Sequence, residues 1–560
     1  MRQKKYTFST LLLLTATLLA CSDSEVQQAT PLIEPVQTEG ADWVLTNGKI
    51  LTADNDFSIA QAMAIEDGRI VAVGNNNEVM SHIGSNTELT DLAGQTLIPG
   101  LIDNHMHFVR ATLQWHRQVR WDGLHSREQA LQMLKERSDT LPEGEWVVVV
   151  GGFIFEQFHD NSEPFTAAEL DALIPDRPVY IQNAYVEAFV NTLAMQEADI
   201  TADSVVNGQG EVLVDENGNP TGHLVGSAMN LAMSHLPEVS DETWDESVAL
   251  TVDSMLAMGL TAVYDVGGAT VNPTYYESVK RVADADNLEM RVFYTLSPQN
   301  SAARTPEDTI REMQNNSPDN DGLYFAQFGY GETVFRPLRA SPFLLSDENK
   351  EHFKNIVITA VENGWQLNEH AAREVKTKAV LDVMEEVAES HPQLRDMRFT
   401  LAHTDGMSEE SIARAMALGM LFATHSSSRS ITMETHESGH MPPPIRTINE
   451  MGGIWGLGSD STTSNSPNPF HTIGWVVTGL SASGNHTFFE TTSREDALVA
   501  HTRTNGYSLF REDDIGSLEI GKLADFVVLN DDYMTVPAEE IKDLYSVMTV
   551  IEGEIAYSAE

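Results

Sequence analysis

Two histidines one residue apart, His105 and His107, end an apolar run that begins at Leu97. Side chains alternate faces along a strand, so both imidazoles would point the same way, roughly 6.6 to 6.8 Å apart along its axis. Two imidazoles on one side of a strand end can bind one metal ion. The pair alone is weak evidence, because histidine is often satisfied inside a protein core.

Three more residues of metal-binding types, His370, His403 and Asp460, each end a short apolar run later in the chain. In a (β/α)8 barrel the C-terminal ends of all strands meet on one face, and catalytic residues come from several strands. The sequence therefore predicts a metal centre at the mouth of such a barrel.

Strand-like runs separated by helical stretches, such as 375–389 and 409–418, are typical of the βαβ units of a parallel barrel. We predict an α/β fold, with a (β/α)8 TIM barrel over residues 97–507. The eight expected strands are 97–104, 261–266, 291–296, 324–329, 365–369, 398–402, 420–424 and 454–458.

Both ends of the chain carry short strand patterns, and Asn47-Gly48 is a strong hairpin turn. Residues 41–96 and 508–560 are predicted to form one small β-sandwich domain built from both termini. The stretch of about 108–253 fits no barrel repeat and has strand patterns of its own. Because a structureless loop of that length is improbable, we expect an inserted subdomain over the barrel mouth.

The chain begins with a basic segment and an apolar run, 11–19, which is typical of a secretory signal. The sequence Leu18-Leu19-Ala20-Cys21 resembles a bacterial lipobox, which implies cleavage before Cys21 and lipidation of its thiol. Residues 21–40 would form a tether. Cys21 is the only cysteine, so no internal disulfide can form. We expect an exported lipoprotein of the cell envelope, on the periplasmic side and anchored through Cys21. Ser22 favours the outer membrane by resemblance to enterobacterial sorting.

Hydrophobic residues make up 41% of the 560 positions, enough for a globular protein. The formal net charge is −49, from 34 Lys and Arg against 83 Asp and Glu. Such a body repels nucleic acid and anionic membrane surfaces, so nucleic acid is excluded as a partner. We read the charge as a solvated acidic surface and expect a small-molecule substrate.

With these residues in this order, the chain resembles the amidohydrolase superfamily of metal-dependent hydrolases. The likeness is greatest to the exported branch that includes N-substituted formamide deformylase, amidohydrolase family 3. It runs from about Trp43 to Tyr557. The motifs that carry it are 99–107, His370, His403, Gly458-Ser459-Asp460 and 515–529.

This resemblance implies that His105 and His107 bind the more buried metal and that His370 and His403 bind a second. Asp460 would ligate the first metal and take a proton from water. Imidazole and carboxylate ligands suit zinc, which lowers the pKa of bound water to roughly 7. The expected cofactor is one or two divalent ions, zinc above all, and Asp460 would pass the proton to the leaving nitrogen.

The chain departs from its relatives in three places. The relatives commonly carry a lysine near the end of the fourth strand that can be carbamylated to bridge two metals, and this chain has no lysine there. Glu332 could supply the bridging carboxylate instead. If Glu332 is an ordinary loop acid, the site would hold one metal. Val186 stands where a pocket histidine is expected, so the substrate should differ. After His370, the segment 371–375 lacks the Gly-Asp pair with which relatives usually start a helix, which alters the rim of the site rather than the ligand set. Separately, Arg373 stands where superfamily deaminases place a glutamate, which disfavours deamination.

Three side chains are candidates for contact with substrate: His425, Tyr330 and His223. His425 follows the seventh strand and could instead be a capping residue. His223 could lie in an exposed turn. Asp265, at the end of the second strand, could orient a ligand histidine or cap a helix.

We therefore expect a metal-dependent amidohydrolase that cleaves a non-peptide C–N bond, amide or formamide-like, with metal-activated water. Two alternatives remain open at this stage. One is a deaminase of the same superfamily, and the other is a surface lipoprotein that binds a ligand without turnover.

Overall fold

The computed structural model describes residues 40–268, 271–298, 304–319, 321–340, 345–425, 442–481, 483–487 and 489–559. The predicted signal peptide, the tether to residue 39 and the lipidation site Cys21 lie outside these ranges. In the described ranges, we find no helix that is both long enough and apolar enough to cross a membrane.

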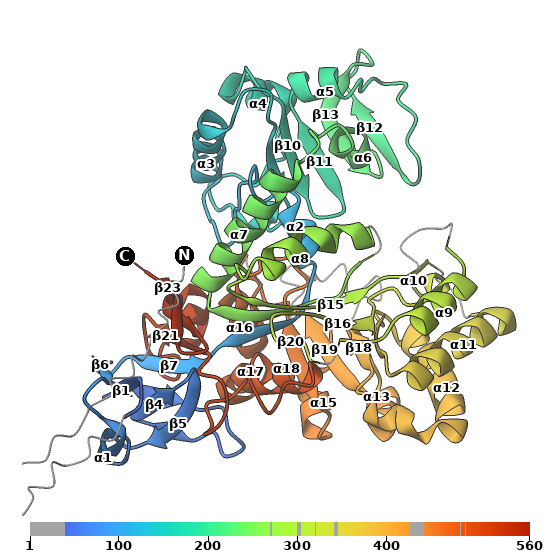
Figure 1. Cartoon of the computed structure of the whole chain (residues 1–560). Coiled ribbons are helices and arrows are strands. Elements are labelled where there is room, and N and C mark those ends of the chain that lie inside the picture. Colours follow the sequence, from blue (N-terminus) through green and yellow to red (C-terminus); the bar gives the residue numbers. More distant parts are fainter. Residues whose placement is uncertain are drawn as a thin grey trace, which may run out of the picture.

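Eight parallel strands form the barrel at the centre of the molecule (Figure 1). Its first and last strands meet: the amide of Asp460 donates to the carbonyl of His105 at 2.8 Å, and that of His107 to Ser461 at 2.9 Å. The predicted (β/α)8 fold is confirmed. In sheet order the strands are β8 (Leu101–Met106), β14 (Leu260–Asp265), β15 (Arg291–Leu296), β16 (Phe325–Tyr330), β17 (Gln366–His370), β18 (Thr400–Ala402), β19 (Leu421–His425) and β20 (Trp455–Gly458).

Helices between the strands pack around the barrel and often begin at a serine. Ser240, Ser346 and Ser408 each accept the backbone amide three residues on, which satisfies a free donor at the helix start. The surrounding helices are α2 (Phe108–Thr112), α7 (Asp241–Ala257), α8 (Tyr276–Asp284), α9 (Pro306–Asn315), α10 (Arg336–Ala340), α11 (Asp347–Asn363), α12 (Glu374–Ser390), α13 (Glu409–Ala417), α15 (Ile445–Glu450), α16 (Pro469–Thr478), α17 (Arg494–Ala500) and α18 (Arg503–Ser508).

Two sheets lie beside the barrel (Figure 1): one contains N-terminal strands only, and the other combines strands from both ends of the chain. Trp43, Leu97 and Phe526 share one core between them. The run predicted as one barrel strand, 97–104, is in fact two strands, since β7 pairs with β2 and β21 in the terminal sheet. One sheet holds β5 (Arg69–Gly74), β4 (Ala62–Glu66), β1 (Trp43–Thr46) and β6 (Glu88–Asp91); the other holds β23 (Glu554–Ser558), β22 (Ser546–Ile551), β21 (Phe526–Leu529), β7 (Thr96–Pro99), β2 (Lys49–Leu51) and β3 (Ile59–Ala60).

A separate sheet stands above the barrel at the top of Figure 1. Its two faces carry two apolar cores, one around Trp121 and one around Tyr180. The helices α2 and α7 at its two ends pack on each other and on β14, so the subdomain proper is narrower than 108–253. It contains β12 (Gly210–Val214), β13 (Pro220–Gly226), β11 (Glu187–Val190), β10 (Val179–Asn183) and β9 (Val147–Val150), with α3 (Arg127–Thr140), α4 (Ala167–Leu173), α5 (Thr192–Glu197) and α6 (Met229–Met233).

A buried ion pair joins the barrel to the terminal domain, and its loss should be costly. Arg291 donates to Asp525 at 2.6 Å and to Glu552 at 2.8 Å, and the side chains of Arg291 and Asp525 are 1% and 3% exposed. Arg291→Met should lower the free energy of unfolding by about 3–5 kcal/mol, because it leaves Asp525 charged and buried. Urea denaturation measures this.

The matched control is Lys280→Met, which removes the exposed ion pair of Lys280 with Asp284 on α8. It should change the urea midpoint little. Adding Asp525→Leu to Arg291→Met should recover part of the loss, since the only carboxylate then left without Arg291 is Glu552, which is 34% exposed. Equal shifts for the Arg291 and Lys280 variants would contradict this role for Arg291.

Candidate metal centre

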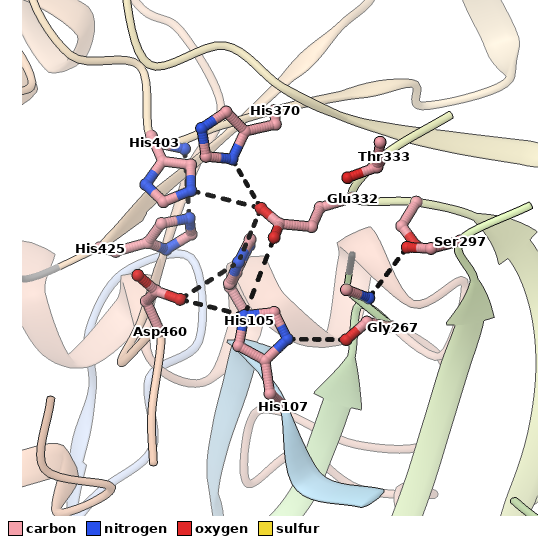
Figure 2. A network of polar contacts seen from close by, with 12 residues as sticks. His105, His107, Gly267, Ser297, Glu332, Thr333, His370, His403, His425 and Asp460 are labelled. Atoms are coloured by element: carbon pink, nitrogen blue, oxygen red, sulfur yellow. Dashed lines mark hydrogen bonds and ion pairs between the residues drawn. The ribbon is translucent and has the colours of Figure 1, made fainter. Parts of the chain in front are cut away.

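Five histidines and two carboxylates meet at the C-terminal ends of the barrel strands (Figure 2). The barrel alone brings them together, since they are spread over more than 350 positions of sequence. They are His105 on β8, His107 directly after it, Glu332 after β16, His370 on β17, His403 after β18, His425 on β19 and Asp460 after β20.

One group consists of His105, His107 and Asp460, whose ligand atoms lie within 4.8 Å of one another. Asp460 Oδ1 is 3.2 Å from His107 Nε2 and 3.8 Å from His105 Nε2. Asp460 has a left-handed backbone, with φ of 53°. Figure 2 shows its carboxylate aimed at both imidazoles.

Backbone contacts fix the orientation of His107. Its Nδ1 donates to the carbonyl of Gly267 at 2.7 Å, so that Nε2 faces Asp460. Asp265 accepts the amide of Gly267 at 2.8 Å and that of Val109, in the first turn of α2, at 2.6 Å. Asp265 thus holds the backbone on both sides of this imidazole, and it bonds to amides rather than to the ring.

The second group consists of Glu332, His370 and His403. His370 Nδ1 donates to Glu332 Oε2 at 2.7 Å, and His403 Nε2 lies 3.4 Å from the same oxygen. Arg339, on α10, donates to Glu332 Oε1. Figure 2 shows the Glu332 carboxylate between the imidazoles of both groups.

Glu332 also contacts the first group, at 3.7 Å from His105 Nε2 and 3.9 Å from His107 Nε2. Its side chain is 2% exposed. Its Oε2 lies near His105, His370 and His403, and its Oε1 lies near His107. The carboxylate thus lies between two imidazole pairs, as a bridge between two cations would. This position favours the bridging interpretation of Glu332 over that of an ordinary loop acid.

The charges of the centre suit cation binding. Burial opposes ionisation of Asp460, but His107, His403 and His425 outweigh it and lower its pKa to about 2. Burial likewise opposes ionisation of Glu332, while Arg339 and the neighbouring histidines hold its pKa well below the usual range. Ionised carboxylates and neutral imidazoles are the forms that bind metal.

The environment of His105 is the strongest structural indication that this centre binds a cation. It is fully buried, and neither of its ring nitrogens has a hydrogen-bond partner among the described residues. Burial, followed by repulsion from His425, holds its pKa well below the usual value. A buried nitrogen without a partner is costly, and a divalent cation would satisfy it. The donor set therefore fits a metal site.

His425, predicted to face the substrate, lies within the cluster itself. Its ring centroid is 3.7 Å from that of His105, and its Nε2 accepts the amide of His403 at 3.1 Å. Its ligand atom groups with those of His105 and His403. The imidazole therefore counts among the residues that could hold a metal.

The other two substrate candidates do not reach the centre. Tyr330 is fully buried and packs edge-on against Trp365, because a register shift in the pairing of β15 with β16 swaps the faces of the strand end. His223, on β13, pairs with Glu187 at 2.7 Å inside the subdomain rather than lying in a turn.

Sequence reasoning missed two arginines that shape the centre. Arg339 follows Glu332 by seven positions on a short helix, and no periodic signal marks it. Arg120 donates to the carbonyl of Thr462 at 2.9 Å and forms two bonds to Asp122, so it ties the loop after Asp460 to the subdomain. Neither contact has a sequence spacing that could have revealed it.

Comparison with known proteins supports the same interpretation. A family model described as "Amidohydrolase family" matches residues 88–557. The chain is 26% identical over 520 residues to Protein LONG AFTER FAR-RED 3 of Arabidopsis thaliana, covering 88% of this chain and 87% of the relative. It is 25% identical over 554 residues to N-substituted formamide deformylase of Arthrobacter pascens, covering 93% and 99%.

Among solved structures, an uncharacterized metal-dependent hydrolase from Pyrococcus horikoshii OT3 superposes with a TM-score of 0.62 at 18% identity, covering 89% of this chain and 99% of that one. This likeness shows the fold. The family model covers most of the sequence, and the strand-end ligand set is complete. This chain belongs to the amidohydrolase family and is a metal-dependent hydrolase acting on carbon–nitrogen bonds.

Proposed function

We propose that the protein hydrolyses an amide or formamide-like, non-peptide C–N bond of a small molecule and that it uses zinc. The observation that carries this is the position of Asp460, an ionised carboxylate in contact with both His105 and His107. One relative is named N-substituted formamide deformylase, which makes N-formyl amines the first compounds to test.

The chain's own residues account for proton movement in this reaction. His105, His107, His370 and His403 would hold the metal, with Glu332 between them. A divalent cation bound there supplies positive charge that polarises the scissile carbonyl and acidifies water. The Asp460 carboxylate accepts one proton from the attacking water and delivers it to the leaving nitrogen, so that amide and water become acid and amine.

The test is to assay the zinc-reconstituted protein against a panel of N-formyl and N-acetyl amines. We expect stoichiometric release of acid and amine from at least one N-formyl compound. Aminated heterocycles are included, and ammonia is measured. Ammonia release without amide hydrolysis would favour the deaminase alternative, and no turnover of any compound would contradict the proposal.

A further inference from the structure

Two nitrogens of an arginine beside the centre have no hydrogen-bond partner among the described residues. Arg110 lies on α2, three positions after His107. Its Nε and Nη2 are buried, and no described residue offers either atom a hydrogen-bond acceptor. In a chain of net charge −49, acidic partners for arginine are abundant. Arg110 is half-buried, and two buried guanidinium nitrogens without an acceptor are therefore unexpected unless a ligand supplies one.

An aromatic ring from the inserted subdomain covers this guanidinium. Tyr185 lies in the turn between β10 and β11, with its ring centroid 5.5 Å from the Arg110 carbon. Because α2 begins directly after His107, Arg110 and the Tyr185 ring over it lie beside the metal centre.

The carboxylates of the centre already have partners of their own. Glu332 is bonded to Arg339 and His370, and Asp460 contacts His107. Neither carboxylate is bonded to Arg110. The free Nε and Nη2 of Arg110 form one edge of the guanidinium, and that edge matches the two oxygens of a carboxylate.

We propose that Arg110, covered by Tyr185, binds a carboxylate group of the substrate. The substrate is then an anionic amide, such as an N-acylated amino acid, rather than a neutral N-substituted amide. This inference rests on the proposed amide hydrolysis. It adds that the substrate carries a carboxylate close to the scissile bond. Arg110 sets specificity, and Tyr185 positions its guanidinium by a cation–π contact.

A matched pair of compounds tests the proposal: N-formylphenylalanine, as both enantiomers, and N-formylphenethylamine, which lacks only the carboxylate. The wild-type protein should prefer the acid. Arg110→Met keeps the length of the stem and should lower kcat/KM for the acid about 10- to 100-fold, mainly through KM. The neutral compound should change less than about twofold. Tyr185→Ala should show a smaller loss and Tyr185→Phe almost none.

Arg311→Met, on the exposed face of α9, is the matched control and should behave as wild type. Equal losses on both compounds, or a wild-type preference for the neutral one, would overturn the carboxylate site. If wild type hydrolyses neither compound, the proposed reaction fails separately. Calorimetry with 3-phenylpropanoate then decides: binding weakened at least about tenfold by Arg110→Met supports the site, and unchanged or absent binding overturns it.

Discussion

Asp460→Asn is expected to lower kcat/KM for amide hydrolysis by about 10²- to 10⁴-fold while leaving the protein folded. Asparagine keeps the size of the side chain and one oxygen toward His107, which is 3.2 Å away in the wild-type protein. It cannot accept a proton from water, whereas the wild-type carboxylate, with a pKa of about 2, is ionised at neutral pH.

Steady-state kinetics and metal content by mass spectrometry, measured on the same preparations, separate the two roles of Asp460. Loss of activity at unchanged metal content identifies the proton-transfer role, while loss of both identifies ligation. Asp253→Asn, on the exposed face of α7, is the matched control. Activity within about tenfold of wild type would contradict the assignment of Asp460 as the proton acceptor.

The barrel could be predicted because its strands are short apolar runs, most of them separated by helical patterns, and 291–296 matches β15 residue for residue. The boundary between the terminal sheet and the first barrel strand could not be predicted from the sequence. Residues 97–102 contain no polar side chain that marks a boundary, yet the chain leaves the terminal sheet at Pro99 and enters the barrel at Leu101. Gly100 permits this change, since a Cβ there would lie 2.3 Å from Thr261 Oγ1. Such an approach is visible only in three dimensions.

Residues of the centre were predictable where a strand end fixes the direction of the side chain, as for His105 and His370. Prediction failed where a bulge or a separate element intervenes. The register shift in β16 turns Tyr330 toward Trp365, and Arg339 reaches Glu332 from a helix that no pattern links to the barrel mouth. Tyr185, in the turn between β10 and β11, is 50% exposed and lies over Arg110, a contact that no sequence pattern indicates.

Glu332→Gln is expected to reduce the bound zinc from about two equivalents per chain to about one, since a neutral amide is a poor substitute for a bridging carboxylate. Glu332 contacts His105 and His107 on one side and His370 and His403 on the other. Mass spectrometry after dialysis against a weak chelator measures the stoichiometry. Glu351→Gln, on the exposed face of α11, is the control and should retain both ions.

Activity of the same variant tells which group of ligands the reaction requires. If His105, His107 and Asp460 hold the essential ion, Glu332→Gln with one equivalent of zinc should keep measurable turnover, and excess zinc should not restore the rest. Arg339 loses the negative charge of its partner in this variant but is 36% exposed, so water can solvate it and the fold should persist. An unchanged number of zinc ions per chain in Glu332→Gln would show that Glu332 does not bridge two metals and would favour a centre with a single metal.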